Sequence, residues 1–148
     1  MAHWESKIRI QRRRNDVWAF VADLKSAPRW MPGVHEWMLH GPRPLGLSAK
    51  ILETRTTGPP TEYTVTAFDP PGRFALTAEI PIGSVSYTYE LADAQAGEAT
   101  EVTVVVELDP RSLLLRLLPP LAVAKLRHLA PRLEILKAIL EKPGKGIP

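Results

Sequence analysis

Residues 62–108 read EYTVTAFDPPGRFALTAEIPIGSVSYTYELADAQAGEATEVTVVVEL, and this stretch decides the fold. Apolar and polar side chains alternate along it, which is the pattern of half-buried strands. One face of segment 84–91 carries only apolar or aromatic side chains, namely Val85, Tyr87, Tyr89 and Leu91. Segments 69–72 and 93–97 are rich in turn-forming residues. The stretch therefore predicts an antiparallel meander, with strands over Glu62–Phe68, Arg73–Ile80, Ser84–Leu91 and Glu101–Leu108.

The chain before residue 62 predicts three more strands and a short helical region. Residues 3–11 alternate in the same way, and segments 34–40 and 47–56 are strand-like and end at Gly-Pro pairs. Between the first two strands, Asn15-Asp16 is a helix-start signal. Apolar residues then recur at helical spacing, which predicts a helix over 16–24. Pro28, Pro32 and Gly33 limit the next helix to about one turn.

The C-terminal part of the chain changes to helical periodicity. Leucines there step by three or four residues, as on one helix face: Leu126, Leu129, Leu133, Leu136 and Leu140. Leu115 and Leu118 extend this stripe upstream, and Pro119-Pro120 predicts a kink between the two parts. We expect one long, bent helix that ends near Glu141.

These elements predict an α+β fold with a curved antiparallel sheet of six to seven strands. Each strand is apolar on one face only, so the sheet needs a cover. The long C-terminal helix is the element that can provide it, and two short helices follow the first strand. A sheet wrapped around one helix in this way usually leaves a space between the two.

Composition narrows the function classes. The chain has 148 residues, 45% of them hydrophobic and 24% charged, which fits a single domain over 1–148, with 143–148 expected to be a loose tail. Because cysteine is absent, disulfides, thiolate metal sites and cysteine nucleophiles are excluded. The net charge of +3 is far from the dense basic stripe of a nucleic-acid-binding domain. Residues 1–7 carry no apolar signal core, so we expect a cytoplasmic protein.

Several stretches together resemble the polyketide cyclase/dehydrase family of the START-like (SRPBCC, birch-pollen-allergen-like) helix-grip superfamily. The resemblance covers nearly the whole chain, and is carried by segments 10–24, 28–34, 65–74, 98–103 and 133–141 and by the glycines of Gly41-Pro42 and Gly46. It implies a helix-grip fold and the binding or conversion of an apolar molecule inside it.

We expect eight residues to contact such a ligand: Trp30, His35, Trp37, Arg55, Tyr63, Phe74, Tyr87 and Tyr89. Aromatic side chains suit flat or aliphatic ligands that need few polar anchors. The alternative for the aromatic residues is an ordinary filled core, and for Trp30 a core position that seats the short helices on the sheet. His35 shares strand parity with Trp37, which would point it to the cavity; a solvated histidine is the alternative.

Charged groups offer a weaker signal. Glu53 and Arg55 share parity with Ile51, so they are an acid and a cation for the cavity rim if that face points inward to the end of the strand. Because an unpaired buried charge is energetically costly, we favour the alternative that this end of the strand is exposed to solvent. No catalytic residue can be assigned, no histidines have metal-ligand spacing, and no cofactor is implied.

Three function classes stay open. The first is a module that binds a small hydrophobic or aromatic molecule, such as a lipid, a quinone or a polyketide-like compound. The second is a cyclase, aromatase or dehydratase that uses the same cavity. The third is a protein-interaction or lipid-presenting adaptor. The leucine-rich segment 113–121 is either the first half of the packing helix or a surface for transient membrane contact, and an exposed apolar patch there would favour the third class. The oligomeric state cannot be deduced.

Overall fold

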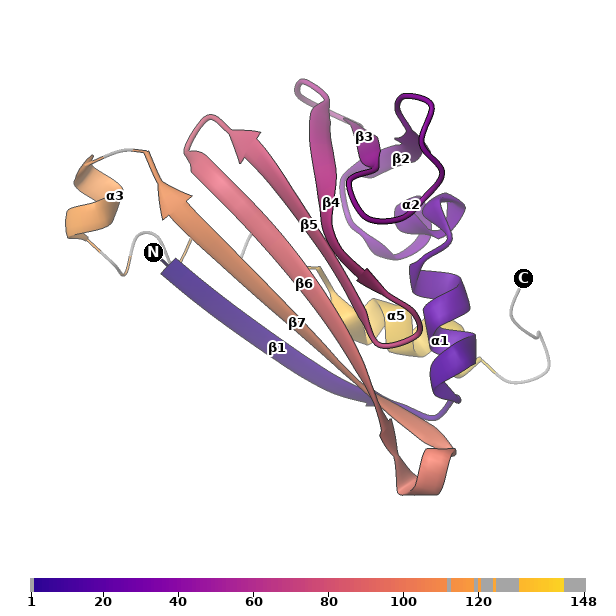
Figure 1. Ribbon diagram of the computed structural model, residues 1–148. Helices are drawn as coiled ribbons and strands as arrows, with labels where there is room; N and C mark the ends of the chain where they lie inside the picture. Colours follow the sequence, from indigo (N-terminus) through magenta and orange to yellow (C-terminus); the bar gives the residue numbers. More distant parts are fainter. Residues whose placement is uncertain (1, 112, 119, 121–123, 125–130, 143–148) are drawn as a thin grey trace.

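The computed structural model describes residues 2–111, 113–118, 120, 124 and 131–142. Its core is one seven-stranded sheet in the order β1-β7-β6-β5-β4-β3-β2, with every neighbouring pair antiparallel (Figure 1). The strands are β1 (Ala2–Ile10), β2 (Val34–Leu39), β3 (Lys50–Arg55), β4 (Thr61–Asp69), β5 (Arg73–Ile80), β6 (Gly83–Ala94) and β7 (Ala99–Pro110). The predicted meander is confirmed, and β1 extends it by pairing with β7.

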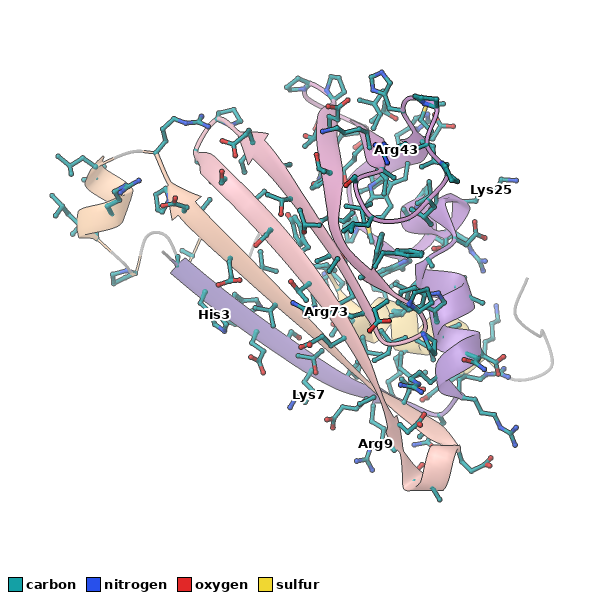
Figure 2. The ribbon with its side chains drawn as sticks, viewed as in Figure 1. His3, Lys7, Arg9, Lys25, Arg43 and Arg73 are labelled. Atoms are coloured by element: carbon teal, nitrogen blue, oxygen red, sulfur yellow. The ribbon has the colours of Figure 1, made fainter. Side chains whose placement is uncertain are left out.

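Alternation along the strands produces one buried face. In β6, Val85, Tyr87 and Tyr89 are buried while the residues between them are more exposed. Leu76 of β5 and Val106 of β7 lie opposite Tyr87 and are buried too. On the outer edge of β1, His3, Lys7 and Arg9 project away from the sheet (Figure 2). The sheet therefore has one apolar face to cover, as the pattern predicts.

Short helices follow β1 and β6, and two more helices are described near the C-terminus. They are α1 (Arg14–Val21), the single 3-10 turns η1 (Leu24–Ser26) and η2 (Gln95–Gly97), α2 (Ala27–Trp30), α3 (Leu113–Leu117) and α5 (Leu133–Leu140). The helix predicted over 16–24 is therefore shorter than expected at its C-terminal end, and η1 takes over from Leu24.

Helix α5 lies within the predicted C-terminal helix and packs on the sheet. It contacts β1 and α2, and buries Leu133, Leu136 and Leu140. Two hydrogen bonds tie its C-terminal end to β1 and to the turn that follows β1: Lys137 Nζ donates to the carbonyl oxygen of Arg9 at 2.7 Å, and Arg12 Nε donates to that of Leu140 at 2.6 Å. Leu126 and Leu129 of the predicted stripe lie outside the described residues.

The expectation that segment 113–121 forms the first half of this packing helix is wrong for the part that the structure describes. Helix α3 follows β7 at the end of the sheet remote from α5 (Figure 1). Exposed leucines lie within α3 (Leu113, Leu114 and Leu117) and directly after it (Leu118). Helical spacing identified a helix, but spacing alone does not show which surface the helix meets.

Replacement of Leu136 by Ala tests the packing of α5 on the sheet. The side chain is fully buried, so we expect a loss of about 2–5 kcal/mol in the free energy of unfolding. Leu47 is 63% exposed, and Leu47→Ala should change stability by less than about 0.5 kcal/mol. Urea unfolding of both variants measures the difference. Equal unfolding midpoints would show that α5 does not contribute to the core.

Candidate functional site

A cavity of about 440 Å³ opens between strands β2 to β6 and the residues that precede α5. Its volume lies in the range of small-molecule sites, about 300–1,000 Å³. The lining residues come from every one of these elements: Met31, Pro32, Val34, Trp37, Glu53, Arg55, Thr61, Tyr63, Leu76, Ile80, Val85, Tyr87, Tyr89, Pro131 and Arg132. Most of the cavity wall is therefore built from the apolar face of the sheet.

Three aromatic side chains form a connected row in the wall. The ring centroid of Tyr63 lies 6.1 Å from that of Trp37 and 6.0 Å from that of Tyr87. Both contacts are in the distance range that aromatic pairs prefer. The three residues come from β2, β4 and β6, so strand alternation is what brings them to one face.

The buried carboxylate of Glu53 is the polar centre of the cavity. Only 3% of the residue is exposed. Trp37 Nε1 donates to Oε1 at 2.8 Å, Arg55 Nη1 donates to Oε2 at 2.8 Å, and the Tyr63 hydroxyl lies 3.5 Å from Oε2. The exposed strand end that we favoured for Glu53 is therefore wrong. The inward parity of Ile51 continues along β3, and the three donors offset the loss of hydration of the charge.

The Arg55 guanidinium bridges this buried group to the surface. Its side chain is 38% exposed, compared with 4% for that of Glu53. It also lies close to the backbone of Gly33, where an added Cβ would approach Nη2 to 2.6 Å. Gly33 has a φ of +83°, so this position suits glycine both for space and for backbone conformation. The turn before β2 therefore leaves room for the guanidinium.

The three phenols of the cavity are held in their neutral form. Burial raises the pKa of Tyr63 far above its usual value, and the neighbouring Tyr87 and the charge of Glu53 raise it further. Burial likewise raises the pKa of Tyr87, with a smaller contribution from Glu53, and burial beside Tyr87 raises that of Tyr89. The hydroxyl groups are thus permanent hydrogen-bond donors and acceptors in an otherwise apolar wall.

Five of the eight expected ligand contacts line this cavity: Trp37, Arg55, Tyr63, Tyr87 and Tyr89. Trp30 and Phe74 lie one layer behind it, each with its ring against Tyr89, at 6.1 and 6.2 Å between centroids. Neither is among the residues that line the cavity, so they support the wall and do not form its surface. Trp30 seats α2 on the sheet in this way.

His35 lies on a different surface. The pairing of β2 with β3 shifts between Val34 and Glu36, so strand parity is broken at His35. The histidine is exposed and faces a shallow depression with Leu24, Lys25 and Pro28, while Trp37 reaches both this depression and the main cavity. The expectation that His35 and Trp37 point the same way is corrected by this bulge, because an extra residue reverses the side-chain alternation.

Sequence reasoning did not assign two groups of lining residues to the site, one in strands and one in loops. Leu76 and Val85 share strand faces with residues that were expected to point inward, so parity alone could have found them. Met31, Pro32 and Arg132 lie outside any strand, and no local pattern marks them.

Among the described residues, no cluster of His, Asp or Glu has the arrangement of a metal site. No helix that the structure describes is long and apolar enough to cross a membrane.

Alkaline titration tests the state of the phenols. The chain has three tyrosines, and all of them line the cavity. Because their pKa values are raised in the folded state, the unfolded chain releases protons above pH about 10 that the folded chain keeps. Stability should be unaffected below that pH and fall as pH rises above it. We expect tyrosinate absorbance to appear only together with loss of the native circular dichroism; reversible ionisation of a folded tyrosine near pH 10 would contradict the assignment.

Comparisons with known proteins agree with this architecture. XoxI from Bacillus cereus superposes with a TM-score of 0.74 at 16% identity, over 96% of this chain and 97% of that one. DynU16, a protein of the dynemicin biosynthetic locus, gives 0.68 at 17% identity, over 96% of this chain and 48% of DynU16. Ara h 8.0201 gives 0.63 at 16% identity, over 93% of each chain. At these identities the likeness shows the fold alone, which is the birch-pollen-allergen-like fold.

Comparison with curated proteins found no match. A family model described as "Polyketide cyclase / dehydrase and lipid transport" matches residues 1–141. This match spans the strands, the cavity and α5. The chain therefore belongs to the polyketide cyclase/dehydrase and lipid transport family.

Proposed function

We propose that this protein binds a small hydrophobic or aromatic molecule, such as a lipid, a quinone or a polyketide-like compound, in the cavity between the sheet and the C-terminal helix. The observation that carries the proposal is the cavity itself, about 440 Å³ in volume and walled mainly by buried aromatic and aliphatic side chains. A filled core would leave no such space. Transfer of an apolar ligand from water to this wall gains about 25 cal/mol for each Å² of apolar surface removed from water.

The polar groups in the wall support an orienting role. The neutral phenol of Tyr87 can donate a hydrogen bond to a carbonyl or hydroxyl oxygen of the ligand, whereas the single O–H of Tyr63 is directed to Glu53. Few polar groups in a mostly apolar pocket are typical of sites that fix the orientation of a small molecule. The family description includes lipid transport, and one structural relative comes from a biosynthetic locus, which is consistent with cargo or substrate of this kind.

Conversion of the ligand is the alternative that the geometry allows. Glu53, Tyr63 and Arg55 converge on one point inside the cavity, and such groups are able to move protons during cyclisation or dehydration. Both carboxylate oxygens of Glu53 are already engaged by protein donors. Proton abstraction by Glu53 would remove the charge that pairs with Arg55, so the geometry favours binding over conversion.

Occupancy of the cavity can be measured with N-phenyl-1-naphthylamine, a neutral dye whose fluorescence rises in apolar surroundings. We expect saturable binding to the wild-type protein. Thr61→Trp adds a large ring to the cavity lining and should weaken dye binding at least about tenfold, since the ring takes up space that the dye would occupy. Thr66→Trp is the matched control, because Thr66 lies on the same strand and is exposed on its other face.

Two results would contradict the binding proposal. One is the absence of saturable fluorescence in a wild-type protein that unfolds cooperatively. The other is equal dye affinity in Thr61→Trp and Thr66→Trp, which would place the dye outside the cavity. Native mass spectrometry of the purified protein would add the identity of any co-purified molecule.

Helix α3 supports a second role, contact with an anionic lipid surface. Leu113, Leu117 and Leu118 are between 44% and 69% exposed. Between residues 111 and 132 the sequence has five basic residues and no acidic one; the basic residues are Arg111, Arg116, Lys125, Arg127 and Arg132. Exposed leucines together with basic residues are the combination that binds the interface of anionic membranes. Arg111 and Arg116 pair with exposed carboxylates, and such pairs are weak.

Sedimentation with lipid vesicles tests this contact. We expect the protein to pellet with phosphatidylglycerol vesicles and to stay in the supernatant with phosphatidylcholine vesicles. The double variant Leu113→Gln/Leu117→Gln should lose most of this binding, because the apolar contribution is removed. Leu47→Gln changes an equally exposed leucine elsewhere on the surface and should bind like wild type. Unchanged binding of the double variant would exclude α3 as the contact.

A further inference from the structure

The charges around the cavity are unevenly distributed. Its deep wall consists of buried residues, whereas Pro32, Arg55 and Arg132 are the exposed ones among its lining, so they mark the mouth. Three lining residues carry charge at neutral pH: Glu53, Arg55 and Arg132. Their sum is 2 − 1 = +1, and the single negative charge is the buried one.

The carboxylate of Glu53 is already paired with a cation of the protein, the Arg55 guanidinium, so its charge is balanced before a ligand enters. Its two oxygens already accept from Trp37 and Arg55, with Tyr63 close by. The guanidinium of Arg55, in contrast, uses one of its five N–H groups on Glu53, and no other acceptor for it is found in the part of the chain that the structure describes. Unused hydrogen-bonding capacity at the mouth is therefore mostly that of donors.

Arg132, which precedes α5, adds a second group of donors to the exposed part of the lining. Its Nε donates to Glu134, a pair in which both side chains are about 60% exposed. Exposed pairs of this kind contribute little, so a ligand anion competes with Glu134 at small cost. The two Nη groups of Arg132 have no acceptor among the described residues.

We propose that the preferred ligand is an amphipathic carboxylic acid, with its apolar body against the tyrosines and its carboxylate at the mouth beside Arg55 and Arg132. This inference rests on the proposed binding function and names its ligand class. A guanidinium presents parallel N–H groups that match the two oxygens of a carboxylate. A ligand cation would meet the net positive charge, and a neutral ligand would leave the donors of the mouth to water.

Displacement of N-phenyl-1-naphthylamine separates this inference from the binding function. Dodecanoic acid and methyl dodecanoate have the same chain and differ in charge; 2-naphthoic acid and its methyl ester repeat the comparison with a flat body. We expect at least one acid to displace the dye about tenfold more tightly than its ester at low ionic strength. Added salt should reduce that ratio, since both guanidinium groups are partly exposed.

Two variants with opposite expected effects test whether the preference for the acid over the ester comes from the charged residues at the mouth. Arg132→Gln removes one cation and should lower the affinity for the acid about threefold, with no effect on the ester. Arg13→Gln is the matched control: like Arg132, Arg13 has an exposed side chain that pairs with an exposed glutamate, and it does not line the cavity. Glu53→Gln keeps the shape of the side chain, removes the negative charge beside Arg55, and should raise the affinity for the acid several-fold.

The possible outcomes are distinguishable. If no dye binds to folded wild-type protein, the binding function itself fails. If the dye binds but each acid and its ester compete equally, or the esters compete better, the carboxylate inference is overturned and the binding function stands. Loss of acid preference in Arg13→Gln as well as in Arg132→Gln would show a general charge effect and would overturn the assignment to the mouth. A rise in acid affinity in Glu53→Gln supports the inference, because a purely structural role of Glu53 predicts a fall.

Discussion

The arrangement of the cavity depends on the buried carboxylate of Glu53. A charge at 3% exposure is tolerated only where donors replace its lost hydration, and here they come from β2, from β3 itself and from β4. Trp37 lies directly opposite Glu53 in the pairing of β2 with β3. The hydrogen bonds thus fix the orientation of two aromatic rings that form the wall. The raised pKa of Tyr63 also reflects this charge, after burial and the neighbouring Tyr87.

The space beside this carboxylate follows from the shape of the fold. Seven strands present an apolar face, and the described helix that packs on it, α5, spans eight residues and contacts mainly β1 and α2. The strands at the other side of the sheet, from β2 to β6, therefore have side chains in the cavity wall instead of against α5. Strands apolar on one face predict that a cover is needed; they do not predict how much of the face the cover reaches.

Features that depend on local periodicity could be predicted from the sequence. Features that depend on strand pairing, or on contacts between residues distant in the sequence, could not. Alternation in 84–91 placed Tyr87 and Tyr89 inward, and the structure agrees. The bulge in β2 reversed the side-chain order at His35, and no residue pattern marks it. Glu53 had the right parity, but its burial depends on Trp37, Arg55 and Tyr63, which are distant from one another until the sheet forms. Likewise, the spacing of the leucines near residue 115 indicated a helix and said nothing of its exposure.

Stability alone does not account for the Glu53–Arg55 pair. Replacement of a buried ion pair by well-packed apolar side chains is often neutral, or stabilises a protein by about 1–4 kcal/mol. An apolar residue at position 53 would continue the pattern of Ala49 and Ile51, which are both fully buried. The pair instead stands where an apolar wall meets a cationic mouth, and Arg55 is half in each environment. A carboxylate there fixes the position of the guanidinium and partly neutralises its charge. Both effects matter far more for a group that contacts a ligand than for one that only fills a core.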